Sequence, residues 1–266
     1  MLTRAITGFF FIILLVGSIF FGANVFVAFF SLVGIWSLYE FYGIIKSDTV
    51  KPNTILGLLV SIVLCLLSGL YFLGYIPLSK LGIIIPFVTF LFISALYQKR
   101  EFPFHDISYS VLGILYATVP FVFFIGLGFI QGEFNPYIPL GFLIMLWSND
   151  TGAYLSGRSF GKHKLFERIS PNKTWEGFIG GVLLALVISL NLEQYFGSLP
   201  KWQWASMAII IGVFGTLGDL VESMLKRSLG VKDSGNILPG HGGLLDRFDG
   251  LLIAAPLVYF FLLMFL

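Results

Sequence analysis

Charge is scarce in this sequence. Only 11% of the 266 residues are charged, whereas a soluble domain carries roughly 25%. Hydrophobic residues make up 57% of the chain, and its mean hydropathy is +0.93. A composition this apolar predicts a polytopic integral membrane protein. The single cysteine, Cys65, excludes an intrachain disulfide.

Several other features are missing. The sequence has no clear internal repeat, soluble domain, long linker or low-complexity tail. It contains no P-loop and no Ser-His-Asp or Cys-His arrangement that would supply a covalent nucleophile. The first apolar run has no small-x-small cleavage site after it, so we predict a retained first span rather than a signal peptide. We expect no nucleic-acid partner.

Long apolar runs are what the chain does contain, and we predict an all-α fold of about nine transmembrane helices. A spanning helix needs roughly 20 apolar residues. The Gly22-Ala23-Asn24 break divides the nearly continuous run 5–43 into two spans. The predicted spans are 5–22, 24–43, 54–73, 80–97, 107–130, 137–156, 175–191, 204–224 and 249–266.

The cations predict the orientation of these spans. Cytoplasmic loops carry an excess of Lys and Arg. With the N-terminus in the cytoplasm, 14 of the 16 cations fall in inside segments, and only Lys80 and Lys201 fall outside. The sequence therefore predicts a cytoplasmic N-terminus. We expect the protein to lie in the cytoplasmic (inner) membrane.

The two halves of the chain differ in character. We predict a scaffold of about five helices in residues 1–130 and a catalytic region in residues 131–266, whose cytoplasmic loops are 157–174 and 225–248. Glu40 is the one intramembrane acid of the first five spans. It is either solvated near a cytoplasmic helix end or in contact with another helix or a lipid path.

Polar side chains enter the membrane in the sixth and eighth spans. Asn149 and Asp150 lie deep in span six, where an acid costs roughly 2.5–3.5 kcal/mol. Asp150 is either satisfied by neighbouring hydroxyls or faces a polar cavity. In span eight, one helix face carries Asp219, Glu222, Ser223 and Lys226 at intervals of three or four residues. A proton relay or a metal site fits an acid at this depth.

The basic loop before span seven ends with S-P-x-K-T-x-E-G, at residues 170–177. Ser170 or Thr174 can cap the following helix, and Glu176 lies in its first turn, where the helix dipole favours an anion. Lys173 beside free helix N–H groups suits a phosphate. A helix N-terminus with a capping residue and an acid in its first turn would explain the same residues without a bound ligand.

The densest polar stretch is 223–249, between the last two apolar runs. It reads S-x-x-K-R-x4-K-D-x-G-x2-L-P-x-H-G-G-x-x-D-R-x-D. This pattern closely resembles the signature of the phosphatidate cytidylyltransferases, also called CDP-diacylglycerol synthases. The 170–177 motif resembles a second motif of that family and of related CTP-dependent lipid kinases. The resemblance covers roughly residues 145–250.

The resemblance implies that CTP and phosphatidate react to give CDP-diacylglycerol and pyrophosphate, with a divalent metal, at the cytoplasmic membrane face. It also implies an all-helical bundle that contacts membrane lipids, and a homodimer. Such a reaction joins two polyanions, so carboxylates should bind Mg²⁺ and cations should bind phosphates. The sequence leaves open whether a second metal ion takes part.

Residue roles follow from this chemistry. As metal ligands we predict Asp219, Asp246 and Asp249. With them, the predicted catalytic residues are Lys226, Arg227 and Arg247. The predicted substrate-binding residues are Asn149, Asp150, Lys173, Ser223, Lys232, His241, Gly242 and Gly243. His241 is either a hydrogen-bond donor to substrate or a satisfied turn residue.

Two other functions are compatible with parts of the pattern. A CTP-dependent polyprenol or dolichol kinase would use similar substrates, but we would not expect the full 223–249 string in it. A secondary transporter could use Asp150, Asp219 and Glu222 as a coupling-ion path. Transporters tend to place their sites at the midplane between repeats, whereas these charges gather at one side of a chain without a clear repeat.

Cysteine labelling tests the predicted orientation. In a Cys65→Ser background, an impermeant thiol reagent added from outside should label single cysteines at positions 77, 135 and 199. Cysteines at positions 48, 103 and 163 should react only from the inside. Labelling of position 163 from outside would reverse the topology.

Overall fold

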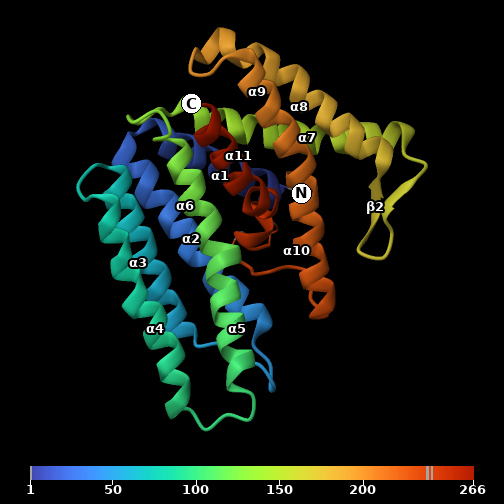
Figure 1. The fold of residues 1–266 in the computed structure, drawn as a ribbon. Coiled ribbons are helices and arrows are strands. Elements are labelled where there is room, and N and C mark those ends of the chain that lie inside the picture. The colour runs from blue at the N-terminus through green and yellow to red at the C-terminus, as the bar shows by residue number, and fades with distance from the viewer. Residues whose placement is uncertain (1, 238–239, 241) are drawn as a thin grey trace. The chain divides into compact units, whose positions relative to one another are not determined.

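The computed structural model describes residues 2–237, 240 and 242–266 (Figure 1). Two compact units are present, one made of residues 1–125 and 231–247 and the other of residues 126–230 and 248–266. Helices dominate both units. Helix covers most of each of the nine predicted spans, which confirms the helical fold class.

The first unit contains most of the N-terminal half of the chain. Its α-helices are α1 (Leu2–Phe20), α2 (Ala23–Ile45), α3 (Thr54–Phe72), α4 (Ile84–Ser94), α5 (Pro103–Gly113) and the start of α6 (Val119–Leu127). Its shorter helical segments are η1 (Leu78–Ile83), η2 (Ala95–Tyr97), η3 (Ile114–Thr118) and η5 (Leu245–Arg247). The polar segment 231–247 thus belongs to the same compact unit as α1–α5.

Helix α2 carries the core of this unit. Phe30 of α2 lies with its ring centroid 4.7 Å from that of Phe124. The buried Tyr42 donates a hydrogen bond of 2.6 Å to the carbonyl of Ser110. Gly57 and Gly113 pass directly against the Tyr42 ring, where any Cβ atom would collide with it. Glycine at these two positions therefore lets α3 and α5 pack closely on α2.

The second unit contains α7 (Tyr137–Phe160), α8 (Trp175–Phe196), α9 (Lys201–Ile210), η4 (Ile211–Gly215), α10 (Thr216–Ser228) and α11 (Asp249–Phe265). Between α7 and α8, β1 (Lys164–Phe166) and β2 (Ser170–Thr174) form an antiparallel hairpin, drawn in yellow in Figure 1. The sequence predicts only a basic loop there, because the strands are too short to show an apolar alternation. The π-helical η4 likewise interrupts the single helix predicted over 204–224.

Close backbone contact joins α7 to α8. A Cβ atom at Gly152 would lie 2.8 Å from the carbonyl oxygen of Gly180, and one at Gly181 would lie 2.7 Å from that of Asn149. Small residues allow helices to approach in this way in membrane proteins. The approach brings the deep polar residues of α7 beside the start of α8.

Six helical stretches within the described residues are long and apolar enough to cross a membrane: Ala23–Ile45, Thr54–Phe72, Leu78–Tyr97, Pro103–Leu127, Trp175–Phe196 and Lys201–Ser228. Ile6–Phe20 and Asp249–Phe265 are shorter apolar helices. Helix α7 covers the predicted sixth span but is not among these stretches. The number of nine spans stays a prediction.

A matched pair of glycine substitutions tests the α7–α8 contact. Gly152→Ala should lower the free energy of unfolding by about 1–3 kcal/mol, because the new methyl group meets backbone that cannot move aside easily. Thermal unfolding of the detergent-solubilised protein measures the change.

Gly43→Ala is the control, since a Cβ atom at Gly43 of α2 meets nothing within 4 Å. Alanine is the better helix former, so this variant should be as stable as the wild type or slightly more so. Equal destabilisation by both substitutions would mean that the α7–α8 contact is not the cause.

Candidate active site

A pocket of about 580 Å³ opens in the second unit beside α7, the hairpin, α8 and α10. Its polar lining includes Asp150, Lys173, Thr216 and Asp219. The sequence leaves Asp150 either paired with hydroxyls or facing a polar cavity, and the structure places it at this pocket. Polar residues from α7, β2 and α10 are thereby brought to one cavity.

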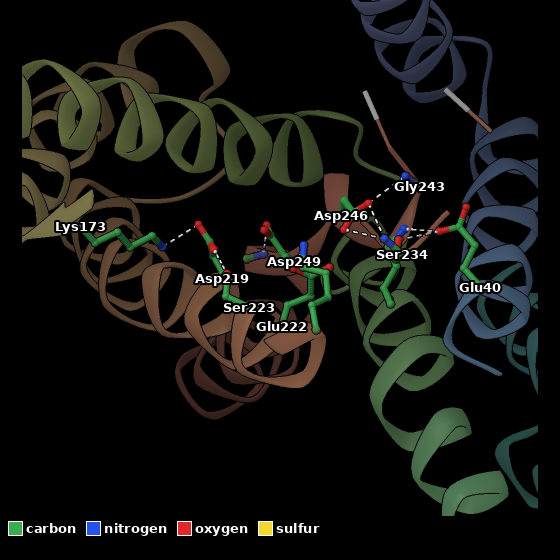
Figure 2. Close-up of polar contacts among 12 residues, drawn as sticks. Glu40, Lys173, Asp219, Glu222, Ser223, Ser234, Gly243, Asp246 and Asp249 are labelled. Carbon is green, nitrogen blue, oxygen red and sulfur yellow. Dashed lines mark hydrogen bonds and ion pairs between the residues drawn. The ribbon is translucent and has the colours of Figure 1, made fainter. Parts of the chain in front are cut away.

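An ion pair crosses this pocket. The Lys173 ammonium lies 2.5 Å from Oδ2 of Asp219, and the Ser223 hydroxyl donates a 3.2 Å hydrogen bond to Oδ1 of the same carboxylate (Figure 2). Both charged side chains keep partial exposure, 25% for Lys173 and 36% for Asp219. Asp219 can therefore hold a positive charge while part of its surface stays open to a ligand.

The hairpin and the helix cap place Lys173. Strand β2 ends at Thr174, whose hydroxyl accepts a 3.1 Å hydrogen bond from the Gly177 amide and caps α8. This confirms the predicted cap. The Glu176 carboxylate accepts hydrogen bonds from the Lys162 and His163 amides at 3.1 and 3.2 Å. The loop before the hairpin is thus tied to the first turn of α8.

Three carboxylates gather near the ion pair. Asp150 of α7, Asp219 of α10 and Asp249 of α11 are close enough to repel one another when ionised. Helices α10 and α11 approach closely because Gly218 has no side chain; a Cβ atom there would lie 2.6 Å from the Asp249 carbonyl oxygen. Such a group of negative charges is stabilised by a cation.

A divalent metal fits this donor set without a preformed cage. Within the described part of the chain, no group of three or more His, Cys, Asp or Glu side chains is arranged to hold a metal ion. Mg²⁺ commonly takes only one or two protein carboxylates, and water and substrate phosphates complete its octahedron. Asp219 and Asp249 are the two carboxylates that we would expect to hold Mg²⁺ in this mode, and Asp219 already pairs with the cationic Lys173.

Two other charged residues of α10, Glu222 and Lys226, pair with each other along the helix. Glu222 is fully buried, and Oε2 of its carboxylate lies 2.5 Å from the Lys226 ammonium. The pairs 219/223 and 222/226 confirm that these four residues follow helical spacing. Arg227 lies next on the same helix, with an exposed side chain.

A second polar cluster lies in the first unit, in the segment 231–247. Oδ2 of Asp246 accepts hydrogen bonds from the Ser234 amide at 2.9 Å and the Gly243 amide at 2.8 Å. Gly242 has a positive φ of 81°, and a Cβ atom there would lie 2.6 Å from Asp246. The carboxylate of Asp246 therefore organises the backbone around it.

Glu40 of α2 belongs to this second cluster (Figure 2). It is only 5% exposed, so the prediction that it is solvated at a helix end is wrong. Its carboxylate instead accepts hydrogen bonds from the backbone amides of Leu244 and Leu245 and from the Ser234 hydroxyl. Nothing in the local sequence around Glu40 shows these three contacts, because Ser234, Leu244 and Leu245 lie 194, 204 and 205 positions along the chain from it.

Four other residues that the sequence predicts for the site are Asn149, Lys232, Arg247 and His241. Asn149 is 1% exposed and donates a 3.2 Å hydrogen bond to the Thr216 hydroxyl, so it supports the α7–α10 contact rather than lining the pocket. Lys232 and Arg247 are exposed in the segment 231–247. His241 lies outside the described residues.

The chain is similar to known proteins over most of its length. Residues 2–265 match the family model described as "Cytidylyltransferase family". A phosphatidate cytidylyltransferase of Bacillus subtilis (strain 168) is 39% identical over 235 residues, which cover 88% of this chain and 87% of the relative. Enzymes of the same name from Staphylococcus aureus (strain COL) and Staphylococcus epidermidis (strain ATCC 12228) are 46% and 44% identical over 162 residues. Those 162 residues cover 60% of this chain and 61% of each staphylococcal protein.

Substitution of Thr174 tests the cap that presents Lys173. Thr174→Ala should lower the free energy of unfolding by about 1 kcal/mol, because the Gly177 amide loses its acceptor. Thr174→Ser retains the hydroxyl and should unfold at nearly the wild-type temperature. If alanine were tolerated as well as serine, the cap would contribute nothing to stability.

Proposed function

The chain belongs to the cytidylyltransferase family, and we propose that it transfers a cytidylyl group from CTP to phosphatidate. The products would be CDP-diacylglycerol and pyrophosphate. The relatives named above are enzymes for that acceptor, and the alignment with the Bacillus subtilis enzyme covers nearly nine tenths of both chains. The observation in this chain that carries the proposal is the Lys173–Asp219 pair at a pocket that Asp150 also lines.

The reaction is a single displacement at the α-phosphorus. An oxygen of the phosphatidate phosphate forms a bond to that phosphorus, and the bond from the α-phosphorus to the oxygen that bridges it to the β-phosphorus breaks. Pyrophosphate leaves with that bridging oxygen. The lipid phosphate is already anionic, so it needs no general base. Catalysis then depends on alignment and on neutralised charge.

The residues of the pocket have different roles in alignment and charge neutralisation, according to their own charge. Lys173 is a point charge for a phosphate, and its ion pair neutralises Asp219. Asp219 and Asp249 would hold Mg²⁺, which neutralises phosphate charge when bound. Ser223 orients the Asp219 carboxylate through its hydrogen bond. A phosphate that draws Lys173 away would leave Asp219 open to the metal.

The segment 223–249 supplies further expected roles. Lys226, Arg227, Lys232 and Arg247 are the cations proposed for the triphosphate and the lipid phosphate. Asp246 as a third metal ligand stays a prediction, based on its position three residues before Asp249. The glycines beside His241 would let backbone approach a phosphate. A second metal ion and a homodimer are further expectations from the family.

The membrane setting agrees with a lipid substrate. Six apolar helical stretches of spanning length lie within the described residues. We propose that the protein is a multi-pass protein of the cytoplasmic membrane, with acyl chains left in the bilayer while the head group reacts at the cytoplasmic face. The basic residues of the loop 157–174 would attract anionic lipid heads to that face.

The position at which CTP is cut tests the proposal. Purified protein, phosphatidate, Mg²⁺ and CTP labelled at the α-phosphate should place the label in the lipid fraction and release unlabelled pyrophosphate. A lipid kinase would cut at the γ-phosphorus and leave the label in soluble CDP. Label in CDP would therefore overturn the proposal in favour of the kinase, and CTP left intact in every lipid and metal tried would favour a transporter.

Asparagine substitutions test the carboxylates. Asp219→Asn and Asp249→Asn should each lower turnover by orders of magnitude while the folded protein remains extractable, because the amide removes the charge that the metal needs. Pyrophosphate release at a series of Mg²⁺ concentrations measures the loss. Asp48→Asn, at an exposed loop position, is the matched control and should retain wild-type turnover. Near-normal turnover in Asp219→Asn would exclude that residue from the metal site.

A further inference from the structure

Glu40 makes an unusually complete set of hydrogen bonds for an acid in a membrane helix. Its Oε1 accepts from the Trp36 indole and the Leu244 amide, both at 3.1 Å. Its Oε2 accepts from the Leu245 amide at 2.9 Å and the Ser234 hydroxyl at 3.2 Å. Three of these four donors belong to the segment 231–247.

The backbone of that segment is shaped around the Glu40 carboxylate. A Cβ atom at Gly235 would lie 2.7 Å from Oε1, and one at Gly243 would collide with Oε2. Only glycine fits so close to the acid at these two positions. The contacts of Glu40 therefore come from both ends of the loop between residues 234 and 245.

The same loop holds Asp246. The Ser234 hydroxyl donates to Glu40 and its amide donates to Asp246. The Gly243 amide donates to Asp246, and a Cβ atom on Gly243 would collide with Glu40. Two carboxylates thus share one short stretch of backbone, shown at the right of Figure 2. The two residues whose N–H groups bond to Asp246 therefore also lie against Glu40.

We propose that Glu40 is a positioning residue for cytidylyl transfer, which acts by anchoring the loop 234–245 and thereby orienting Asp246. This inference rests on the proposed function and on the role predicted there for Asp246. Partners that orient a ligating carboxylate commonly contribute about 10- to 100-fold in metal affinity or activity. A buried acid of the N-terminal half would then be part of the site's support and not only of the scaffold.

Glu40→Gln is the sharpest substitution, because it keeps the size and shape of the side chain. Its amide nitrogen replaces one acceptor oxygen and faces two former donors, of which only the Ser234 hydroxyl can reverse its role. At least one donor must lose its acceptor. We expect a 10- to 100-fold lower rate of pyrophosphate release at saturating substrates. Glu40→Asp keeps the charge and should recover part of that rate.

Hydrogen exchange of the full chain in detergent supplies a readout that does not depend on activity. In Glu40→Gln, amide exchange should become faster in peptides that cover residues 233–246 and should stay unchanged in α3 and α8. If the glutamine variant does not fold, Ser234→Ala retains the Glu40 charge and should show a smaller change in the same peptides, with a several-fold lower rate.

Asp106→Asn is the matched control. Asp106 is another buried acid of the first unit, and it accepts hydrogen bonds from the Lys51 amide at 2.7 Å and Arg100 Nε at 2.9 Å. Its substitution should lower thermal stability but should change neither the exchange of residues 233–246 nor the rate of the folded enzyme. Equal losses of rate in both variants would reduce Glu40 to a general stability role and overturn the proposal.

Two further results would contradict the inference. Wild-type exchange in 233–246 in Glu40→Gln would show that the acid does not anchor the loop. Faster exchange with a normal rate would show that the anchored loop is not needed for transfer. If the wild-type protein released no pyrophosphate from CTP, the proposed function would be wrong. The exchange comparison would still decide whether Glu40 anchors the loop.

Discussion

A charged group inside an apolar protein needs a partner of opposite charge or several hydrogen-bond donors. Three polar groupings in the described part of the chain follow that requirement. Lys173 meets Asp219, Lys226 meets the fully buried Glu222, and four donors surround Glu40. Where carboxylates gather without enough positive charge, as Asp150, Asp219 and Asp249 do, the excess of negative charge favours a metal ion and a cationic side chain.

Glycine makes these pairings possible. Gly218 lets α10 approach the start of α11, and Gly152 lets α7 approach α8. Gly235 and Gly243 bring backbone directly against Glu40. At Gly235 and Gly243 a side chain would push the backbone away from the Glu40 carboxylate, and at Gly152 and Gly218 it would push two helices apart.

Local patterns in the sequence predict local structure well. The three- and four-residue spacing of Asp219, Glu222, Ser223 and Lys226 predicts their pairs on α10, and the Thr174 cap follows from its place before an apolar run. Apolar runs likewise predict where the helices lie. These features depend on residues within one or two helical turns of each other.

Long-range pairing is what local patterns cannot show. The Lys173–Asp219 pair joins residues 46 positions apart, and Glu40 reaches Ser234 across 194 positions. Such contacts depend on how helices pack, which hydrophobic periodicity does not specify. The sequence shows that Glu40 is an energetically costly acid in an apolar helix, but it does not show which loop residues bond to it. The short hairpin and the π-helical η4 are not predicted for a related reason. Each is too short to produce a hydrophobic periodicity that can be recognised in the sequence.

The central claim is that two polyanions react directly with each other, aligned by paired charges and without a covalent enzyme intermediate. The stereochemical course at the α-phosphorus tests it most directly. CTP made chiral by sulfur at that phosphorus should give a lipid product of inverted configuration, because a single in-line displacement inverts the centre. Retention of configuration would reveal two successive displacements, and therefore a covalent intermediate that contradicts this account.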